Sequence, residues 1–170
     1  KSRGNVVNPD DIIRDFGADS LRLYEMFMGP LRETKLWRTK GVEGCSRFLA
    51  RSYRLFDSCT DQPPTDEQLR TVHKCIAKVT EETENLRFNT AIAAMMEFTN
   101  AATKWEQRPK AVLRPFVLLL SPYAPHVSEE LWERLGNQAS NAYEAWPVAD
   151  PTYLKQDTFT LAVQVNGKMR

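Results

Sequence analysis

The sequence predicts a mainly α-helical fold, in which a helical bundle is followed by a short, truncated β-hairpin at the C-terminal end. Three observations favour this fold. Apolar residues recur three and four positions apart through most of the chain, which is the period of amphipathic helices. Proline and glycine stand at the ends of these segments. Near the C-terminus the period changes to strict alternation, which is typical of a strand.

Two short helices open the predicted fold. The first spans Pro9–Phe16, because the side chain of Asn8 can accept a hydrogen bond from the first turn and proline suits the first helical position. The second spans Asp19–Met28 and ends at a Gly-Pro pair. A connector of both charge signs, Leu31–Lys40, follows. Its one large aromatic side chain, Trp37, is expected to fill the joint between the short helices and the bundle.

The third helix is predicted over Val42–Cys59 and is the most clearly amphipathic. Its apolar face holds Cys45, Phe48, Leu49, Ser52, Leu55 and Phe56. On nearly the opposite side, Arg47, Arg51 and Arg54 fall within an arc of about 60°. No acid is expected one turn away on that stripe, and the planar guanidinium group suits phosphate oxygens. The three arginines are therefore candidate contacts for a polyanion, with a solvated helix face as the alternative.

Four further helical segments complete the predicted bundle. The first begins after Thr65. Its narrow apolar seam consists of Leu69, Val72, Ile76, Val79, Thr83 and Leu86. The second opens at Asn89 and stops before Pro109. The third, Ala111–Leu120, is apolar on nearly all sides and should be the most buried, and the fourth spans His126–Leu135 before a glycine.

The C-terminal part of the sequence predicts a linker and a hairpin. Trp146 precedes a proline and is expected to pin the linker to the bundle. Apolar and polar residues alternate over Thr158–Val165, which predicts a strand. Asn166-Gly167 is the strongest two-residue hairpin signal. Because only three residues remain for the return strand, the sequence truncates this hairpin.

Composition limits the classes of function. The 170 residues, 42% of them apolar, can bury one core, and the formal net charge is only +1. A nucleic acid would therefore have to be bound by a local basic stripe rather than by the whole surface. No apolar run reaches the length of a membrane span, so no membrane contact is expected.

Cysteine and histidine patterns favour neither a disulfide framework nor a metal site. The three cysteines, Cys45, Cys59 and Cys75, cannot form an even-numbered framework, which suits a reducing compartment. His73 and Cys75 form an H-x-C pair, but a tetrahedral structural zinc needs four ligands, usually as two close pairs. We therefore expect no metal site, and the two histidines offer no catalytic triad.

The first nine residues, K-S-R-G-N-V-V-N-P, combine features that suit a polyphosphate. Lys1 supplies a mobile point charge, Ser2 a small hydrogen-bond donor, and Gly4 allows close approach of the main chain. The same residue types occur in many solvated loops that precede a capped helix, so the pattern alone leaves both interpretations open.

Six later blocks give the sequence a resemblance to class I aminoacyl-tRNA synthetases, and specifically to the leucyl-tRNA synthetases of the bacterial and organellar type. The blocks are G-A-D-S-L-R at 17–22, G-V-E-G at 41–44, F-N-T-A-I-A at 88–93, P-Y-A-P-H at 122–126, W-P-V-A-D at 146–150 and V-Q-V-N-G-K at 163–168. The opening K-S-R-G-N-V-V-N-P and the block at 17–22 are shared with valyl, isoleucyl and methionyl relatives, whereas the later blocks, especially V-Q-V-N-G-K, favour leucyl. The resemblance covers essentially the whole chain.

The resemblance implies a division of labour along the chain. Residues 1–40 would be the end of the catalytic domain with its connecting helices, 41–150 the anticodon-binding bundle, and 151–170 a linker and the start of a C-terminal domain. Lys1 and Ser2 would belong to the signature loop K-M-S-K-S, in which Lys1 binds ATP and stabilises charge developing on pyrophosphate. Magnesium is expected with ATP in the full-length enzyme.

The resemblance also implies partners and a reaction. The parent enzyme would join leucine to tRNA(Leu), converting ATP to AMP and pyrophosphate, and Arg47 and Arg51 match positions where the family presents arginines to tRNA. Because the upstream half of the ATP site is missing, the isolated chain should not activate leucine. We expect a monomer that works in the cytoplasm, or in an organelle of a eukaryote.

Two alternatives stay open from the sequence. One is the equivalent region of a valyl- or isoleucyl-tRNA synthetase, in which the bundle would recognise anticodon bases. The other is a helical scaffold that binds protein, which would need a large exposed apolar patch. The first is disfavoured by the V-Q-V-N-G-K block. The second is disfavoured because the apolar faces of the predicted helices are expected to be buried together in one core, which leaves no large apolar patch exposed.

Overall fold

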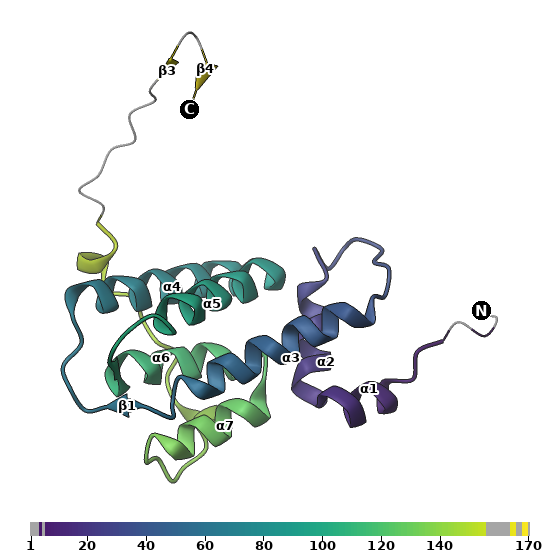
Figure 1. Ribbon diagram of the computed structural model, residues 1–170, viewed down its shortest axis with the longest axis horizontal. Coiled ribbons are helices and arrows are strands. Elements are labelled where there is room, and N and C mark those ends of the chain that lie inside the picture. Colours follow the sequence, from purple (N-terminus) through teal and green to yellow (C-terminus); the bar gives the residue numbers. More distant parts are fainter. Residues whose placement is uncertain (1–3, 5, 156–163, 166–167, 170) are drawn as a thin grey trace.

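The structure is a computed structural model that describes residues 4, 6–155, 164–165 and 168–169. Its described helices are α1 (Pro9–Phe16), α2 (Ala18–Phe27), α3 (Thr39–Arg54), α4 (Asp66–Glu84), α5 (Phe88–Ala102), α6 (Lys110–Leu120) and α7 (Pro125–Arg134), with short 3₁₀ turns at Asn141–Tyr143 and Pro151–Tyr153. Figure 1 shows α4 and α5 side by side along one side of the bundle and α3 crossing from the bundle to α2. The predicted mainly helical fold is confirmed.

The signals at the start of the chain form the helices that they predict. Asn8 accepts a hydrogen bond from the backbone N–H of Asp10 at 3.1 Å and so caps α1. Gly17, with φ of 84°, separates α1 from α2 in a backbone conformation that a side chain would disfavour. Arg22 of α2 donates to the carbonyl of Pro122 at 3.0 Å. The short helices are thereby joined to the turn between α6 and α7.

Helix α3 differs from the predicted Val42–Cys59 at both ends. It begins at Thr39 and ends at Arg54, after which the backbone turns and Cys59–Thr60 forms β1. This short strand pairs in parallel with β2 (Arg108–Pro109), a contact between residues about fifty positions apart. Arg108 supports the pairing, because its guanidinium donates to Ser58 and to the carbonyls of Ala102 and Thr103 at the end of α5. Helical periodicity cannot reveal such a non-local contact.

The core is formed by buried side chains of α3, α4, α5 and α6, to which α2 and α7 add Leu23 and Trp132. Helix α6 is the most completely buried element, as predicted, with six of its eleven side chains inside: Val112, Leu113, Phe116, Val117, Leu119 and Leu120. One polar pair lies within this apolar core, since the hydroxyls of Ser52 and Thr99 are both fully buried and 3.1 Å apart. The hydrogen bond satisfies both groups and fixes the pairing of α3 with α5.

Helix α4 carries the predicted seam except at its end. Thr65 and Gln68 form a capping box at its start. Val72, Ile76 and Val79 are buried, but Leu86 is 60% exposed and adopts a positive φ of 57°. The prediction that Leu86 belongs to the seam is wrong, because the helix ends at Glu84 and this residue serves as the left-handed turn into α5.

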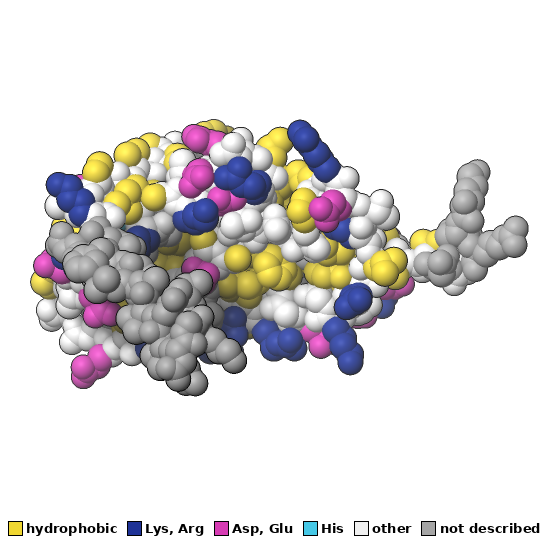
Figure 2. Space-filling model, turned by 90° about the horizontal axis from the view of Figure 1, so that it is seen from above, with side chains coloured by type: hydrophobic (Ala, Val, Ile, Leu, Met, Phe, Trp, Pro, Cys, Tyr) yellow, Lys and Arg dark blue, Asp and Glu magenta, His cyan; other side chains and the backbone are white. Residues whose placement is uncertain are grey.

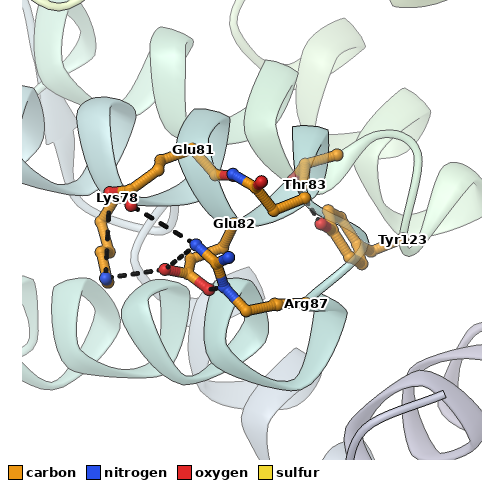
Figure 3. A network of polar contacts seen from close by, with 7 residues as sticks. Lys78, Glu81, Glu82, Thr83, Arg87 and Tyr123 are labelled. Carbon is orange, nitrogen blue, oxygen red and sulfur yellow. Dashed lines mark hydrogen bonds and ion pairs between the residues drawn. The ribbon is translucent and has the colours of Figure 1, made fainter. Parts of the chain in front are cut away.

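A buried carboxylate joins the end of α4 to the start of α5. Glu82 is 2% exposed, and its two oxygens accept from Lys78 at 2.7 Å and from Arg87 at 2.5 and 3.0 Å (Figure 3). Next to it, the hydroxyls of Thr83 and Tyr123 lie 2.5 Å apart and link α4 to the turn after α6. The hydrogen bonds from Arg87 and then Lys78 lower the pKa of Glu82 from its ordinary 4.5 to about 2.

This shift predicts how acid affects the free energy of unfolding. Because the folded state holds the carboxylate ionised, its stabilising contribution is present above the ordinary pKa of 4.5 and is lost as pH falls from there towards 2. Glu82→Gln should flatten that part of the pH dependence. The check is the urea midpoint between pH 7 and 2.5. Glu81→Gln is the matched control, because this neighbour is 60% exposed, and an equal change in both variants would contradict the role of Glu82.

The segment after α7 is attached along α4. Trp146 donates its indole N–H to the hydroxyl of Thr80 at 2.8 Å, which confirms that it pins the linker. His73 accepts from the backbone N–H of Asp150 at 3.1 Å and stacks on Tyr153, with ring centroids 4.9 Å apart. Further on, β3 (Gln164–Val165) pairs antiparallel with β4 (Lys168–Met169), which confirms the hairpin. Most of the predicted strand, residues 158–163, lies outside the described residues.

Candidate nucleic-acid interface

The exposed face of α3 carries the predicted arginines. Arg47 is largely exposed, Arg51 is half-buried and Arg54 is exposed on the last turn. The expectation that no acid lies one turn away is wrong, because Glu43 pairs with Arg47 at 3.6 Å across one helical turn. Both partners are well exposed, so the pair is weak and leaves the guanidinium available to another anion.

A groove of about 970 Å³ lies beside this face. Its walls come from α2, the connector that follows it, α3 and one residue of α5, Met96. Five of the lining side chains are basic and one, Glu33, is acidic; the basic ones are Lys35, Arg38, Lys40, Arg47 and Arg51. The groove therefore concentrates positive charge in a protein whose formal net charge is only +1.

Aromatic packing holds the connector in place. Trp37 meets Tyr24 edge-on, with ring centroids 5.0 Å apart, which confirms that it fills the joint. The hydroxyl of Tyr24 accepts the backbone N–H of Arg38 at 2.9 Å. Lys35 donates to the carbonyl of Gly29 at 2.6 Å, so its charge is partly engaged within the connector itself. These contacts bring the basic side chains of the connector to the same groove as those of α3.

Several of these cations lack an internal partner. Among the described residues, the side chains of Arg38, Lys40, Arg51 and Arg54 form no ion pair within 4.0 Å. The Nε of Arg51 is also buried without a hydrogen-bond partner in the part of the chain that the structure describes. Such a set of cations, converging from two segments, is suited to successive phosphates of a polyanion.

The structure brings only part of the predicted site together. Arg47 and Arg51 line the groove, whereas Arg54 lies further along the same face and does not line it. Lys1 and Ser2 lie outside the described residues. Sequence reasoning missed three cations of the groove: Lys35 and Arg38 on the connector, and Lys40 on the first turn of α3. The only sequence signal for these three cations was the number of basic residues between Leu31 and Lys40, and Glu33 in the same segment obscured it.

Other hollows and clusters do not suit a polyanion. A groove of about 600 Å³ between α4 and α5 has a mainly apolar floor and a rim of both charge signs, formed by Lys74, Lys78, Glu81 and Glu97. Figure 2 shows the face seen from above, where charged side chains of both signs surround a band of hydrophobic ones. A third hollow beside α7 is lined by Glu129, Glu130 and Glu133. The groove beside α3 is therefore the candidate interface.

Buried thiols and hydrogen-bonded histidine rings indicate structural roles for these side chains. Burial raises the pKa of the Cys45 thiol to about 11 and that of Cys75 to about 12, which disfavours the thiolate that binds metals. His73 is engaged with the linker, and the Nδ1 of His126 lies 2.8 Å from the buried carboxylate of Asp19. Within the described ranges, no three His, Cys, Asp or Glu side chains are grouped as for a metal ion. None of the described helices is long and apolar enough to cross a membrane.

Comparison with known proteins agrees with this helical architecture. A family model for the anticodon-binding domain of tRNA ligases matches residues 67–170. Leucine–tRNA ligase of Rhodopirellula baltica is 50% identical over 181 aligned residues, which cover 100% of this chain and 19% of that protein. Leucine–tRNA ligase of Leptospira biflexa is also 50% identical, over 177 residues that cover 100% of this chain and 20% of that protein. The chain thus spans about a fifth of the length of these relatives.

A solved structure shares the fold. It is the ternary complex of the agnB2 LeuRS of Agrobacterium radiobacter K84 with tRNA and LeuAMS. The match has a TM-score of 0.81 at 32% sequence identity and covers 100% of this chain and 24% of that one. With the family match over more than half of its residues, the chain belongs to the anticodon-binding domain family of tRNA ligases, and it matches leucine–tRNA ligases along its whole length.

Proposed function

We propose that this chain is the tRNA-binding part of a leucine–tRNA ligase, which joins leucine to tRNA(Leu) and converts ATP to AMP and pyrophosphate. The observation that carries the proposal is the groove beside α3, where five basic side chains converge in a protein with little net charge. The identity of 50% to a leucine–tRNA ligase, over the whole of this chain, supports the choice of amino acid. Bundle and groove would hold the tRNA body so that its acceptor end reaches the catalytic site.

Contacts in the groove would be to the phosphates and sugars of tRNA rather than to anticodon bases. Leucine has six codons in the standard code, so its tRNAs offer no single anticodon to recognise. Guanidinium groups such as those of Arg47 and Arg51 bind phosphate oxygens without regard to base sequence. Such contacts position the nucleic acid and leave the choice of tRNA to other features.

The proposal assigns separate tasks along the chain. Residues 1–40 close the catalytic domain, residues 41–150 form the tRNA-binding bundle, and residues 151–170 lead into a C-terminal domain. Lys1 and Ser2 belong to the loop that covers ATP, where the charge of Lys1 stabilises the pyrophosphate as it leaves. Magnesium accompanies ATP in the full-length enzyme. The enzyme acts as a monomer, in the bacterial cytoplasm or in an organelle.

Amino-acid-dependent exchange of pyrophosphate into ATP tests this function. The full-length protein should catalyse exchange with leucine and attach leucine to tRNA(Leu), while valine and isoleucine support neither reaction at comparable concentrations. Exchange with valine or isoleucine in place of leucine would reject the assignment and favour the corresponding ligase. Exchange with leucine but no attachment to tRNA(Leu) would reject the proposed role of the bundle.

A further inference from the structure

Helix α3 contains two glycines within its first two turns, Gly41 and Gly44. Glycine inside a helix lowers stability relative to alanine, because its backbone loses more freedom on folding and it brings no side chain to pack. Each of these glycines therefore needs a reason. The reason for one lies within the protein, and the reason for the other does not.

Packing explains Gly41. A Cβ atom at this position would lie 2.2 Å from Cε2 of Tyr24 and 2.9 Å from its Cζ, far inside van der Waals contact. The Tyr24 ring is buried and held by Trp37, so it cannot easily move away. Gly41 thus lets α3 approach α2 closely at the Tyr24 ring.

Packing does not explain Gly44. A Cβ atom there would meet nothing within 4 Å, because the position faces open space in the groove. At 100° per residue, Gly44 lies within an arc of about 60° that also holds Lys40, Arg47 and Arg51. The bare stretch of helix backbone is therefore surrounded by cations that line the same groove.

We infer that Gly44 is the contact point where the sugar–phosphate backbone of the bound tRNA lies directly against α3. This inference rests on the proposed function and adds a steric requirement to its electrostatic one. Without a side chain at position 44, a phosphate can approach the helix closely enough for Arg47 and Arg51 to reach it from the next turns. A methyl group at this position would hold the RNA away from both guanidinium groups and lengthen their hydrogen bonds.

The test compares Gly44→Ala and Gly44→Leu in the full-length protein, using a transcript of tRNA(Leu) as the probe. Affinity should fall about tenfold for Gly44→Ala and further for Gly44→Leu, because the obstruction grows with side-chain size. The thermal unfolding midpoint should stay the same or rise, since alanine and leucine are better helix formers than glycine. Affinity and stability should therefore change in opposite directions.

Ala50→Ser is the matched control. Ala50 is exposed on α3 but lines a different hollow, so one added heavy atom there should leave affinity unchanged. Unchanged affinity of Gly44→Ala, together with a loss for Arg47→Ala/Arg51→Ala, would overturn this inference while leaving the proposed function in place. If both Gly44→Ala and Arg47→Ala/Arg51→Ala left affinity unchanged, the proposed function would fail as well. A lower unfolding midpoint for Gly44→Ala would assign the glycine to internal packing and also overturn the inference.

Discussion

Replacing Arg47 and Arg51 together by alanine is expected to weaken the affinity of the full-length protein for tRNA(Leu) by about a hundredfold at low salt. Hydrogen bonds to charged groups contribute roughly 1.5–3 kcal/mol each, and two lost contacts therefore correspond to about 3 kcal/mol or more. Leucine activation should remain intact, because neither residue supports the apolar core: Arg47 is largely exposed and Arg51 half-buried. Equilibrium binding and leucine-dependent pyrophosphate exchange measure the two effects separately.

The salt dependence of the same binding reaction identifies the type of contact. Each lost phosphate contact should reduce the slope of log affinity against log salt by about 0.7 to 0.9, so the double variant should lose between one and two units of slope. Arg70→Ala/Lys74→Ala controls for net charge, because it also removes two positive charges, from exposed residues of α4 that do not line the groove. Normal affinity with an unchanged slope would make the α3 stripe a solvated helix face.

Gly41→Ala should lower the stability of the 170-residue chain by about 2 kcal/mol. The added methyl group would overlap the Tyr24 ring, and forcing extra atoms into a packed site typically costs about 1–3 kcal/mol. The gain in helix propensity offsets only part of this cost. For a chain of this size the thermal midpoint should fall by roughly 4–8 °C, as followed by circular dichroism.

Two further variants separate this clash from a general effect of substitution in α3. Gly44→Ala adds the same methyl group three residues away, where it meets no neighbour, and should not lower the midpoint. Tyr24→Leu combined with Gly41→Ala should be less destabilised than the sum of the two single changes, because the smaller side chain makes room for the methyl group. Equal midpoints for Gly41→Ala and the unaltered chain would show that the close approach does not constrain the joint.

Local signals predicted most of the helices. Asn8 and the Thr65–Gln68 capping box mark helix starts, and Gly17 and Gly136 mark helix ends, since each acts on backbone groups within one turn. The burial of α6 also followed from composition, because a segment that is apolar on nearly all sides has no solvated face. These features depend on neighbours in sequence, which a single sequence displays.

Features that depend on distant residues were missed. Helix α3 ends at Arg54, and Cys59, predicted as its last residue, lies instead in the strand Cys59–Thr60, which pairs with Arg108–Pro109, a partner that periodicity cannot reveal. Leu86 continues the apolar spacing of α4, yet it adopts the left-handed conformation usually given to glycine and points its side chain towards solvent. In both cases the apolar spacing of the helix continues in the sequence beyond the residue at which the helix ends in the structure.

The candidate site was half predictable for the same reason. Arg47 and Arg51 share one helix face, so their spacing places them together without knowledge of the fold. Arg38 joins them only because Tyr24 holds the connector against α3, whereas Lys40 lies on the first turn of α3 and shares their face. Glu43 was overlooked as the partner of Arg47, although its position four residues earlier is a local signal that the sequence displays.

The most direct test of the central claim is the affinity for leucine tRNAs that carry different anticodons, measured for the unaltered full-length protein and for Arg47→Ala/Arg51→Ala. If the groove beside α3 binds the sugar–phosphate backbone, the double substitution should weaken binding by the same factor for every anticodon, because phosphate contacts carry no base information. A loss confined to tRNAs with one anticodon, or no loss with any of them, would contradict the claim.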